Sequence, residues 1–431
     1  MWKLFCKMIF RIPLVWRILL AFVLGIGLGL LCSNLSPATK ENIITYSSPF
    51  GTVLIAILKM VVFPVIFFSL IFGSSQMPLK KSGKIGGAVI GWYFLTSAIA
   101  TVFGVLIAIL INPSLAEGGG MAVQYADQTV SLERPSTGES VIAFVNGLFQ
   151  NPFAALASGS FLPVIVYAIL FGLAARCILD STESHQQEFQ AVQTMLHLCR
   201  GAAVISFKMI DWAMEYFPIG VFALTFSNFT RDGILLFGPY LQIVVVVCAG
   251  VFFMLFAIYP LAVFLGCREN PYRFLWQVRQ PVLTAFATRS SAAALPVSLK
   301  TAEKIGISQS LYCFSLPLGC TINMDGVCIH LPVFVILAGN MFGIDFTFSQ
   351  LILLVVSVVF ASVGAGGIPG GSVFLLFMVL ENMGLTPDQV GTVVALALGI
   401  NPLLDMFETA CNVTGDNVCT YIIARRNGLI S

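Results

Sequence analysis

Six polar side chains recur at helical spacing near the end of the chain, within an otherwise apolar segment. Steps of three and four residues place them along one broad face of a helix. Residues 389–404 carry no charge, and the segment is long enough to cross a bilayer. A polar face on such a helix must line a cavity, so we interpret it as one wall of a binding site. Its members are Asn401, Asp405, Glu408, Thr409, Asn412 and Asp416.

A second candidate site surrounds Asp325, which has 20 uncharged residues on one side and 19 on the other. A lone carboxylate at bilayer depth costs about 2.5–3.5 kcal/mol on insertion scales, and a bound cation would offset that cost. Asn323 and carbonyl groups freed by an interrupted helix would supply further oxygen ligands. The alternatives are a structural ion pair and a protonated acid.

Two further segments interrupt apolar runs with small residues. Residues 286–296 contain the hydroxyl pair Ser290–Ser291, several alanines and a proline, and a helix N-terminus there would offer free N–H groups to an anion. Residues 362–372 contain five glycines and a proline, which a regular helix cannot sustain. Open backbone within a membrane is tolerated only against protein or water. We expect two hairpin tips; a kinked helix and a flexible outside loop are the respective alternatives.

The composition shows which solvent surrounds these segments. The chain has 431 residues, of which 58% are hydrophobic and 10% charged, and its mean hydropathy is +0.94. A soluble domain would carry roughly a quarter charged residues, so we expect lipid around this chain. The net charge of +2 gives no reason to expect nucleic acid as a partner. The long uncharged stretches are 18–39, 60–79, 85–116, 140–175, 233–267, 305–324 and 346–380.

The distribution of lysine and arginine gives a topology. Basic residues up to Arg17 place the N-terminus inside, ahead of a retained first helix at 18–33, and the acidic loop at roughly 113–139 lies outside. Residues 281–298 lie between two basic clusters, so they cannot cross once and are predicted to enter from the cytoplasm and return. Residues 351–380 are predicted to form the opposed hairpin.

The remaining segments complete an all-α polytopic membrane protein of eight transmembrane helices and two re-entrant hairpins. Residues 305–340 cross outward, and a last helix at about 391–424 runs inward to Arg425–Arg426. Both termini are therefore predicted to be cytoplasmic, in the cell (inner) membrane. Opposed hairpins and interrupted helices that meet at the middle of the membrane are how many secondary transporters build their sites.

Several of these motifs resemble one family. Asn323–Gly326 (NMDG) and Asn412–Asp416 (NVTGD) are similar to signatures of the sodium:dicarboxylate symporter family, which includes glutamate and neutral amino acid transporters. Gly364–Gly370 and Arg289–Ser291 resemble its two hairpin tips. The match extends over essentially the whole chain. Further similarity comes from its second and third helices, at Lys59, Met60, Pro64, Phe67, Tyr93, Thr96 and Ser97.

The resemblance implies a glutamate-transporter-like elevator fold in a homotrimer, embedded in the lipid bilayer. Residues 1–80 would form scaffold helices 1 and 2, and residues 81–113 helix 3 of the transport domain. Residues 114–230 would form scaffold helices 4 and 5 with the outside loop. Residues 231–431 would complete the mobile transport domain with helix 6, hairpin 1, helix 7, hairpin 2 and helix 8.

The resemblance also implies ligands for sodium as the coupling ion, with no other cofactor. Asp405 would hold the ammonium group of an amino acid substrate, and Asn412 with Ser291 its carboxylate. The implied substrate residues are Arg289, Ser290, Ser291, Gly367, Asp405, Glu408, Thr409 and Asn412. The implied sodium ligands are Tyr93, Thr96, Ser97, Gly319, Thr321, Asn323, Asp325, Ser362, Asn412 and Asp416.

Three positions depart from the family pattern. Val327 replaces a threonine, Ala292 shortens the serine run, and Glu408 stands where members with acidic substrates carry an arginine. Glu408 would pair with Arg289 and leave a site for neutral substrates, or it would meet a cationic or hydroxyl-bearing side chain. We therefore predict a sodium-coupled symporter that imports a neutral amino acid. The alternative is a sodium- or proton-coupled glutamate/aspartate or C4-dicarboxylate symporter that uses Arg289 as the anion partner.

Other functional classes have less support. A passive channel would not explain two separately buried carboxylates. The three histidines are dispersed, and Ser290 and Ser291 have no nearby base in the sequence, so we do not expect an enzyme. The chain contains no phosphate-binding GxxxxGK[ST] motif, which argues against direct use of ATP.

Overall fold

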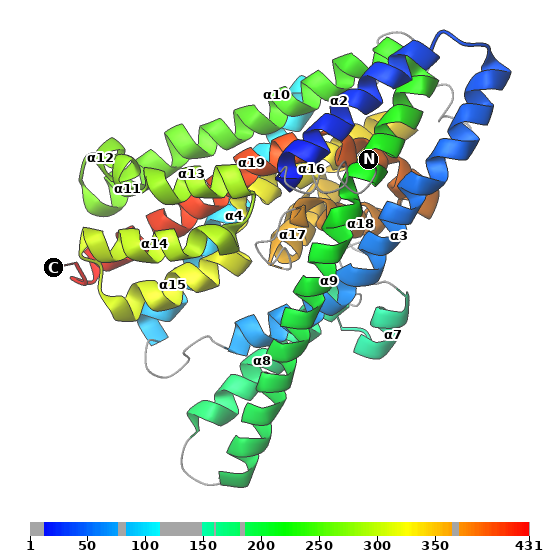
Figure 1. Ribbon diagram of the computed structural model, residues 1–431. Coiled ribbons are helices and arrows are strands. Elements are labelled where there is room, and N and C mark those ends of the chain that lie inside the picture. Colours follow the sequence, from blue (N-terminus) through cyan, green and yellow to red (C-terminus); the bar gives the residue numbers. More distant parts are fainter. Residues whose placement is uncertain are drawn as a thin grey trace, which may run out of the picture.

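The computed structural model describes residues 13–75, 83–112, 149–158, 161–181, 186–363 and 370–430. Within these ranges the chain is almost entirely helical and contains no strand; an isolated bridge joins Ile307 to Ile430. This architecture agrees with the all-α class predicted from the sequence. The helices form two groups that pack against each other (Figure 1).

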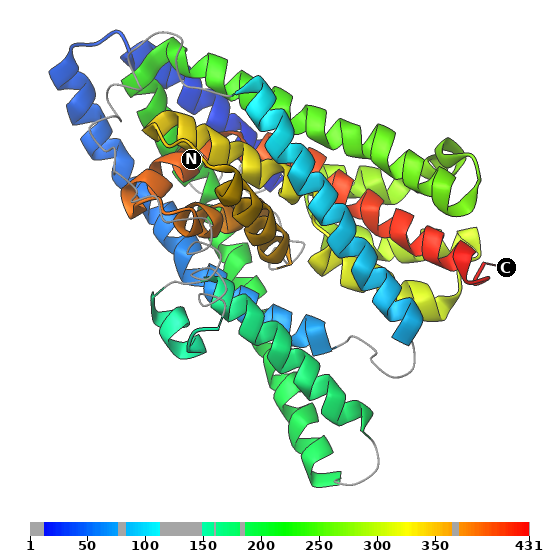
Figure 2. The ribbon, with the colours of Figure 1, turned by 180° about the vertical axis from the view of Figure 1, so that it is seen from behind.

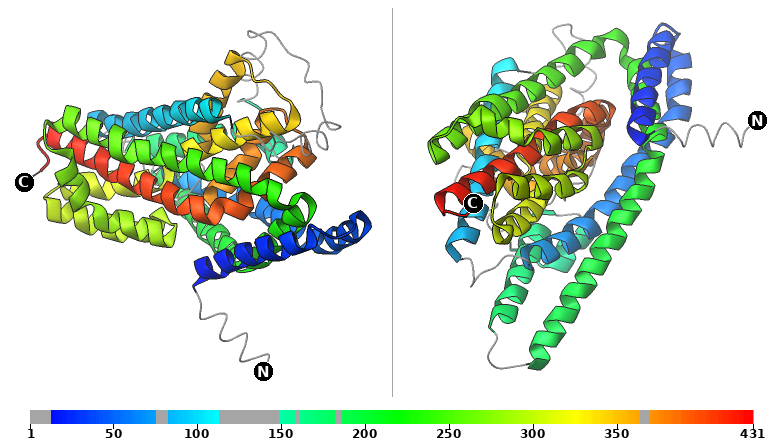
Figure 3. Two further views of the ribbon diagram at one scale, coloured as in Figure 1. Left: turned by 90° about the horizontal axis from the view of Figure 1, so that it is seen from above. Right: turned by 60° about the vertical axis from the view of Figure 1, so that its left-hand side comes forward.

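In the first helix group, α9 packs extensively on α2 and α3, α3 packs on α8, and the short α7 contacts α8 (Figures 1 and 3). Glycines allow the close packing of α3 and α9, because a Cβ atom on Gly220 would lie 2.4 Å from the Leu54 side chain. Pro218 lies inside α9. The elements are α2 (Leu14–Cys32), α3 (Pro37–Ser75), α7 (Pro152–Ser158), α8 (Phe161–Asp180) and α9 (Gln186–Asp232).

The second helix group is built around α19, which contacts nearly all of its other members. Figure 2 shows α4, in cyan, lying across the back of this group, where it packs on α16. The elements are α4 (Gly83–Ile111), η1 (Gly233–Leu236), α10 (Phe237–Phe253), the π-helix η2 (Met254–Ile258), α11 (Tyr259–Cys267), α12 (Pro271–Gln277), α13 (Arg279–Thr288), α14 (Ser291–Ile305), α15 (Gln309–Ile322), α16 (Asp325–Phe342), α17 (Phe348–Ser362), α18 (Gly371–Asn382) and α19 (Pro387–Arg426).

Two helical hairpins lie where the sequence predicts them. Helices α13 and α14 pack together around a turn in which Arg289 has a φ of 53° and Ser290 caps α14. Helices α17 and α18 also pack together, and most of the predicted tip between them, residues 364–369, lies outside the described residues. Figure 1 shows the two hairpins on opposite sides of the middle of the second helix group. The sides from which they enter a membrane stay a prediction.

The predicted crossing at 305–340 is two helices rather than one. Helix α15 ends at Ile322, and α16 begins at Asp325. Asn323 and Met324 between them have extended or irregular backbone, with ψ angles of 92° and 55°. Carbonyl groups at the end of α15 and N–H groups at the start of α16 therefore face the same interruption.

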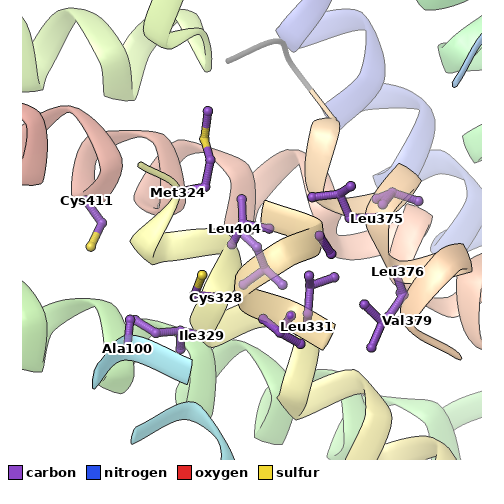
Figure 4. Packing of buried hydrophobic residues seen from close by; sticks show 14 of the residues in the cluster. Ala100, Met324, Cys328, Ile329, Leu331, Leu375, Leu376, Val379, Leu404 and Cys411 are labelled. Carbon is purple, nitrogen blue, oxygen red and sulfur yellow. The ribbon is translucent and has the colours of Figure 1, made fainter. Parts of the chain in front are cut away.

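Helix α16 is buried by protein on all sides. Figure 4 shows apolar side chains of α16, α18 and α19 packed together, among them Leu331, Leu376, Val379 and Leu404, all fully buried. Close packing of this kind leaves few voids and holds the backbone rigidly. The apolar core thus fixes the position of the α15–α16 interruption and of the facing part of α19.

Five helical stretches in the described ranges are long and apolar enough to cross a membrane, and one of them is α15 and α16 taken together. The eight crossings predicted from the sequence stay a prediction. The first helix, predicted at 18–33, corresponds to α2, and the uncharged stretch at 18–39 continues through a turn to the start of α3. The five candidate spans are Lys84–Ile111, Pro163–Asp180, Tyr240–Cys267, Gln309–Phe342 and Gln389–Arg426.

Candidate functional site

Asp325 lies at the helix interruption and is completely buried. The Ser97 hydroxyl of α4 donates to its Oδ1 at 3.1 Å, and the Tyr259 hydroxyl of α11 donates to its Oδ2 at 2.7 Å. Within the described residues, no lysine, arginine or histidine forms an ion pair with this carboxylate. Three elements distant in the sequence therefore converge on one buried anion.

Asp416 of α19 is a second buried carboxylate next to the α15–α16 interruption. Its Oδ1 accepts a hydrogen bond from Asn323 Nδ2 at 3.0 Å, and Asn323 Oδ1 accepts one from the Thr96 hydroxyl at 3.2 Å. A Cβ atom at Gly319 would lie 2.4 Å from Asp416 Oδ1 and 2.7 Å from the Tyr93 hydroxyl oxygen. Only glycine leaves this approach open without a shift of the neighbours.

Together these residues form what we call the Asp325 cluster: Tyr93, Thr96, Ser97, Tyr259, Gly319, Asn323, Asp325 and Asp416. Its two carboxylates have hydrogen-bond donors but, among the described residues, no cationic side chain to balance them. Isolated buried charge is costly and is normally paired or bound to a metal ion. The polar side chains of the cluster present hydroxyl and carboxylate oxygens and one amide, which suit a hard cation, and the Cys411 sulfur lies 3.5 Å from the Tyr259 hydroxyl.

The two hairpin tips meet α19 at a different carboxylate, Asp405. The backbone N–H of Gly370, next to the second tip, donates to Asp405 Oδ2 at 3.0 Å. Arg289 at the first tip places Nη1 4.0 Å from the same oxygen, and both side chains are buried. The left-handed backbone of Arg289 turns the chain at this point, and the residue that makes the turn also carries the charge.

Glu408 has a partner that the sequence did not suggest. Its Oε1 lies 2.5 Å from His330 Nδ1 of α16, and both side chains are essentially fully buried. The pairing of Glu408 with Arg289, one of the two predicted outcomes, is not what the structure shows, because Arg289 lies against Asp405. Helices α16 and α19 can approach this closely because Gly326 has no side chain. A Cβ atom at that position would lie 2.5 Å from the Glu408 backbone. We call Arg289, His330, Asp405 and Glu408 the Asp405 cluster.

The other predicted residues take varied positions. Asn412 of α19 contacts the start of α16 next to Asp325, where its Oδ1 accepts from the Gly326 N–H at 2.7 Å. Ser291 is buried behind the first tip, whereas Ser290 Oγ caps α14 by accepting from the Ala293 N–H. Gly367 lies outside the described residues. Three hydroxyls bond to backbone carbonyls of their own helix segment: Thr321 to Leu318, Ser362 to Val359 and Thr409 to Asp405.

Two residues of the site were missed by sequence reasoning. His330 was counted only as one of three dispersed histidines, although an ionisable side chain inside an apolar helix is itself a signal of function. Tyr259 had no such signal, since a tyrosine at the end of an apolar run is common. It follows the π-helix η2, an irregularity that often accompanies functional sites.

Comparison with known proteins agrees with these motifs. Residues 14–426 match the profile of the sodium:dicarboxylate symporter family. Proton/sodium-glutamate symport proteins of Bacillus caldotenax and Geobacillus stearothermophilus are each 29% identical over 429 residues, which cover 97% of this chain and 95% of each protein. The serine/threonine transporter SstT of Bifidobacterium adolescentis is 28% identical over 397 residues, which cover 92% of this chain and 87% of that protein.

Proposed function

The chain belongs to the sodium:dicarboxylate symporter family, and we propose that it is a sodium-coupled secondary active symporter that imports a neutral amino acid. The observation that carries the proposal is the charge imbalance of the Asp325 cluster. Asp325 and Asp416 are buried with hydrogen-bond donors around them but without a cationic side chain among the described residues. Bound sodium would supply the missing positive charge.

Coupling follows from that imbalance. Without sodium, the second helix group carries buried negative charge that would be costly to move through lipid. Sodium would lower this cost and would fix the α15–α16 interruption by contacts with Asn323 and Asp325. Asn412, which bonds to the Gly326 N–H, connects this interruption to the face of α19 that would receive the substrate. Sodium binding would therefore prepare the substrate site.

The Asp405 cluster supports a neutral substrate. Asp405 would accept the substrate ammonium group, and Asn412 with Ser291 would receive its carboxylate, near the positive charge of Arg289. Glu408 would repel a side-chain carboxylate. Among the related proteins, one is named for serine and threonine and two for glutamate, so the family accommodates both kinds of substrate.

The arrangement of the helices suggests how the site would move. We assign the first helix group to a scaffold and the second to the mobile transport domain of an elevator mechanism. The exposed apolar side chains of the first group, such as Trp212 and Ile205, would contact lipid or neighbouring subunits of a homotrimer. Both termini would lie in the cytoplasm, with the protein in the inner membrane.

The test is uptake by proteoliposomes that contain the purified protein. Labelled serine, alanine, glutamate, aspartate and arginine would be offered under an inward sodium gradient, under a proton gradient, and with neither. We expect serine or alanine to accumulate above equilibrium only with sodium. Equal uptake under a proton gradient without sodium would refute sodium coupling. Fluxes that equilibrate but never concentrate the substrate would indicate a channel.

A second candidate is glutamate symport, which the presence of Arg289 at the first tip favours. It requires Arg289 to leave Asp405, 4.0 Å away, and to bind the substrate's side-chain carboxylate instead. Accumulation of glutamate in preference to serine in the same assay would establish this alternative.

A further inference from the structure

The His330–Glu408 pair lies outside the pattern expected from the family resemblance. Its short contact uses only half of its hydrogen-bonding atoms. Glu408 Oε2 and His330 Nε2 are both buried and, within the described part of the chain, have no hydrogen-bond partner. Buried polar atoms are nearly always paired, so two unpaired atoms on adjacent side chains indicate a place for a ligand group.

The pair is close to the residues that would hold the substrate's main-chain groups. Glu408 follows Asp405 by three residues on α19, which places the two side chains on the same face with Cβ atoms about 5–6 Å apart. Arg289 lies 4.0 Å from the Asp405 carboxylate, and His330 contacts Glu408. A substrate whose ammonium group binds Asp405 therefore needs only a short side chain to reach Glu408.

Charge balance defines the chemistry that this position accepts. Arg289 lies against Asp405, so it balances that carboxylate. At 2.5 Å, His330 Nδ1 and Glu408 Oε1 are within hydrogen-bond distance, and a buried pair is least costly when it carries no net charge. A carboxylate side chain would then find no unbalanced cation, and an ammonium side chain no unbalanced anion. An uncharged donor would satisfy the open carboxylate oxygen.

We propose that His330 is a specificity-determining residue, which holds Glu408 so that its free oxygen accepts a hydrogen bond from the hydroxyl of a short amino acid substrate. The inference rests on the proposed function and narrows its substrate class to amino acids such as serine or threonine. His330 acts as a positioning residue through Nδ1. Its ring is itself held by stacking on Phe334, with ring centroids 4.6 Å apart.

The experiment compares serine with alanine, which differ only in the hydroxyl group. Sodium-driven uptake would be measured for the wild type, His330→Phe and His330→Asn. Phenylalanine keeps a ring that can stack on Phe334 but removes Nδ1, whereas asparagine can place an amide nitrogen near the position of Nδ1. The matched control is His197→Phe, the same change at an exposed histidine of α9.

We expect the wild type to prefer serine over alanine. In His330→Phe the ratio of the KM for alanine to the KM for serine should fall about tenfold, which is the usual effect of one hydrogen bond to a charged group. The KM for serine should rise about tenfold more than the KM for alanine, with the half-saturating sodium concentration unchanged. His330→Asn should restore much of the preference, and His197→Phe should behave as wild type.

The outcomes separate this inference from the function on which it rests. If the wild type imports neutral amino acids with sodium but His330→Phe keeps the serine preference, the role of His330 is refuted and the symporter assignment stands. Preference of the wild type for alanine or glutamate over serine would also refute it. Absence of any sodium-driven amino acid uptake would overturn both.

Discussion

The Asp325 cluster and the Asp405 cluster both contain carboxylates from α19, but only the Asp405 cluster also contains side chains that can carry positive charge. Asp325 and Asp416 are surrounded by hydroxyl and amide groups, without a cationic side chain among the described residues. Asp405 and Glu408 each lie near a group that can carry positive charge, Arg289 and His330. One region lacks a cation, and the other is already close to neutral.

This difference explains why the two regions suit different ligands. A site with unbalanced anions and oxygen ligands gains most from a small cation, which restores neutrality. A site with balanced charges suits a zwitterion. The ammonium and carboxylate groups of the zwitterion pair with the charged side chains of the site, and no net charge is added. The chemistry of a coupled symporter thus follows from where the positive side chains are placed, and each cluster can be altered separately.

The largest effect should come from Asp325→Ala. This change removes one of the two unbalanced carboxylates and the acceptor for both Ser97 and Tyr259. We expect sodium-driven uptake to fall to the level of empty liposomes, while the protein still inserts and purifies in normal yield. The control is Asp345→Ala, at an exposed aspartate beyond the end of α16. Sodium-dependent uptake that persists in Asp325→Ala would contradict the assignment of the cation site.

The contrasting change is Asp405→Asn, in the other cluster. Asparagine cannot balance Arg289 or hold an ammonium group, so the substrate KM should rise about a hundredfold, as when one partner of a buried charged contact is truncated. Sodium binding without substrate, followed by calorimetry, should remain close to wild type. Asp211→Asn, at an exposed residue of α9, provides the control. If sodium affinity fell as much as substrate affinity, the two clusters could not be treated as separate.

A change of one methyl group tests how closely the Asp325 cluster is packed. In Gly319→Ala the new Cβ would lie 2.4 Å from Asp416 Oδ1, so this carboxylate must move. Overpacking typically costs 1–3 kcal/mol, and the half-saturating sodium concentration should rise about thirtyfold. Gly91→Ala on α4 is the matched control, since its Cβ would meet no atom within 4 Å. Equal sodium dependence of the two variants would show that Asp416 takes no part in binding the cation.

The sequence predicts the charged residues of the site better than their partners. Asp325 and Asp416 stand out because carboxylates are rare in long apolar stretches, and the first tip stands out because hydroxyls and small residues interrupt such a stretch. The pairing of His330 with Glu408 depends instead on how closely α16 and α19 approach at Gly326. A helical period shows which residues share a face, but it does not reveal which helix lies opposite.

The fold shows the same division. Charge patterns located both hairpins correctly, because their boundaries coincide with basic clusters or glycine-rich segments. The first helix, predicted at 18–33, agrees with α2, which ends at Cys32. The charge pattern gave a single crossing at 305–340 and did not show its division into α15 and α16. At that division the Asn323 side chain bonds to both Thr96 and Asp416, and such contacts between distant segments cannot be read from a charge pattern.

The smallest effect should come from Tyr259→Phe, which tests a contact that no sequence pattern announced. The change removes the hydroxyl that donates to Asp325 Oδ2 at 2.7 Å and leaves the ring in place. The ionised carboxylate loses one donor, so the half-saturating sodium concentration should rise about tenfold, the usual effect of one hydrogen bond to a charged group. In the control, Tyr216→Phe, a hydroxyl that bonds to the Phe50 carbonyl is lost from the first helix group, and sodium dependence should not change. Identical sodium dependence of the two variants would mean that the cation does not use Asp325 Oδ2. A raised serine KM at saturating sodium in Tyr259→Phe would instead show that the two clusters respond as one.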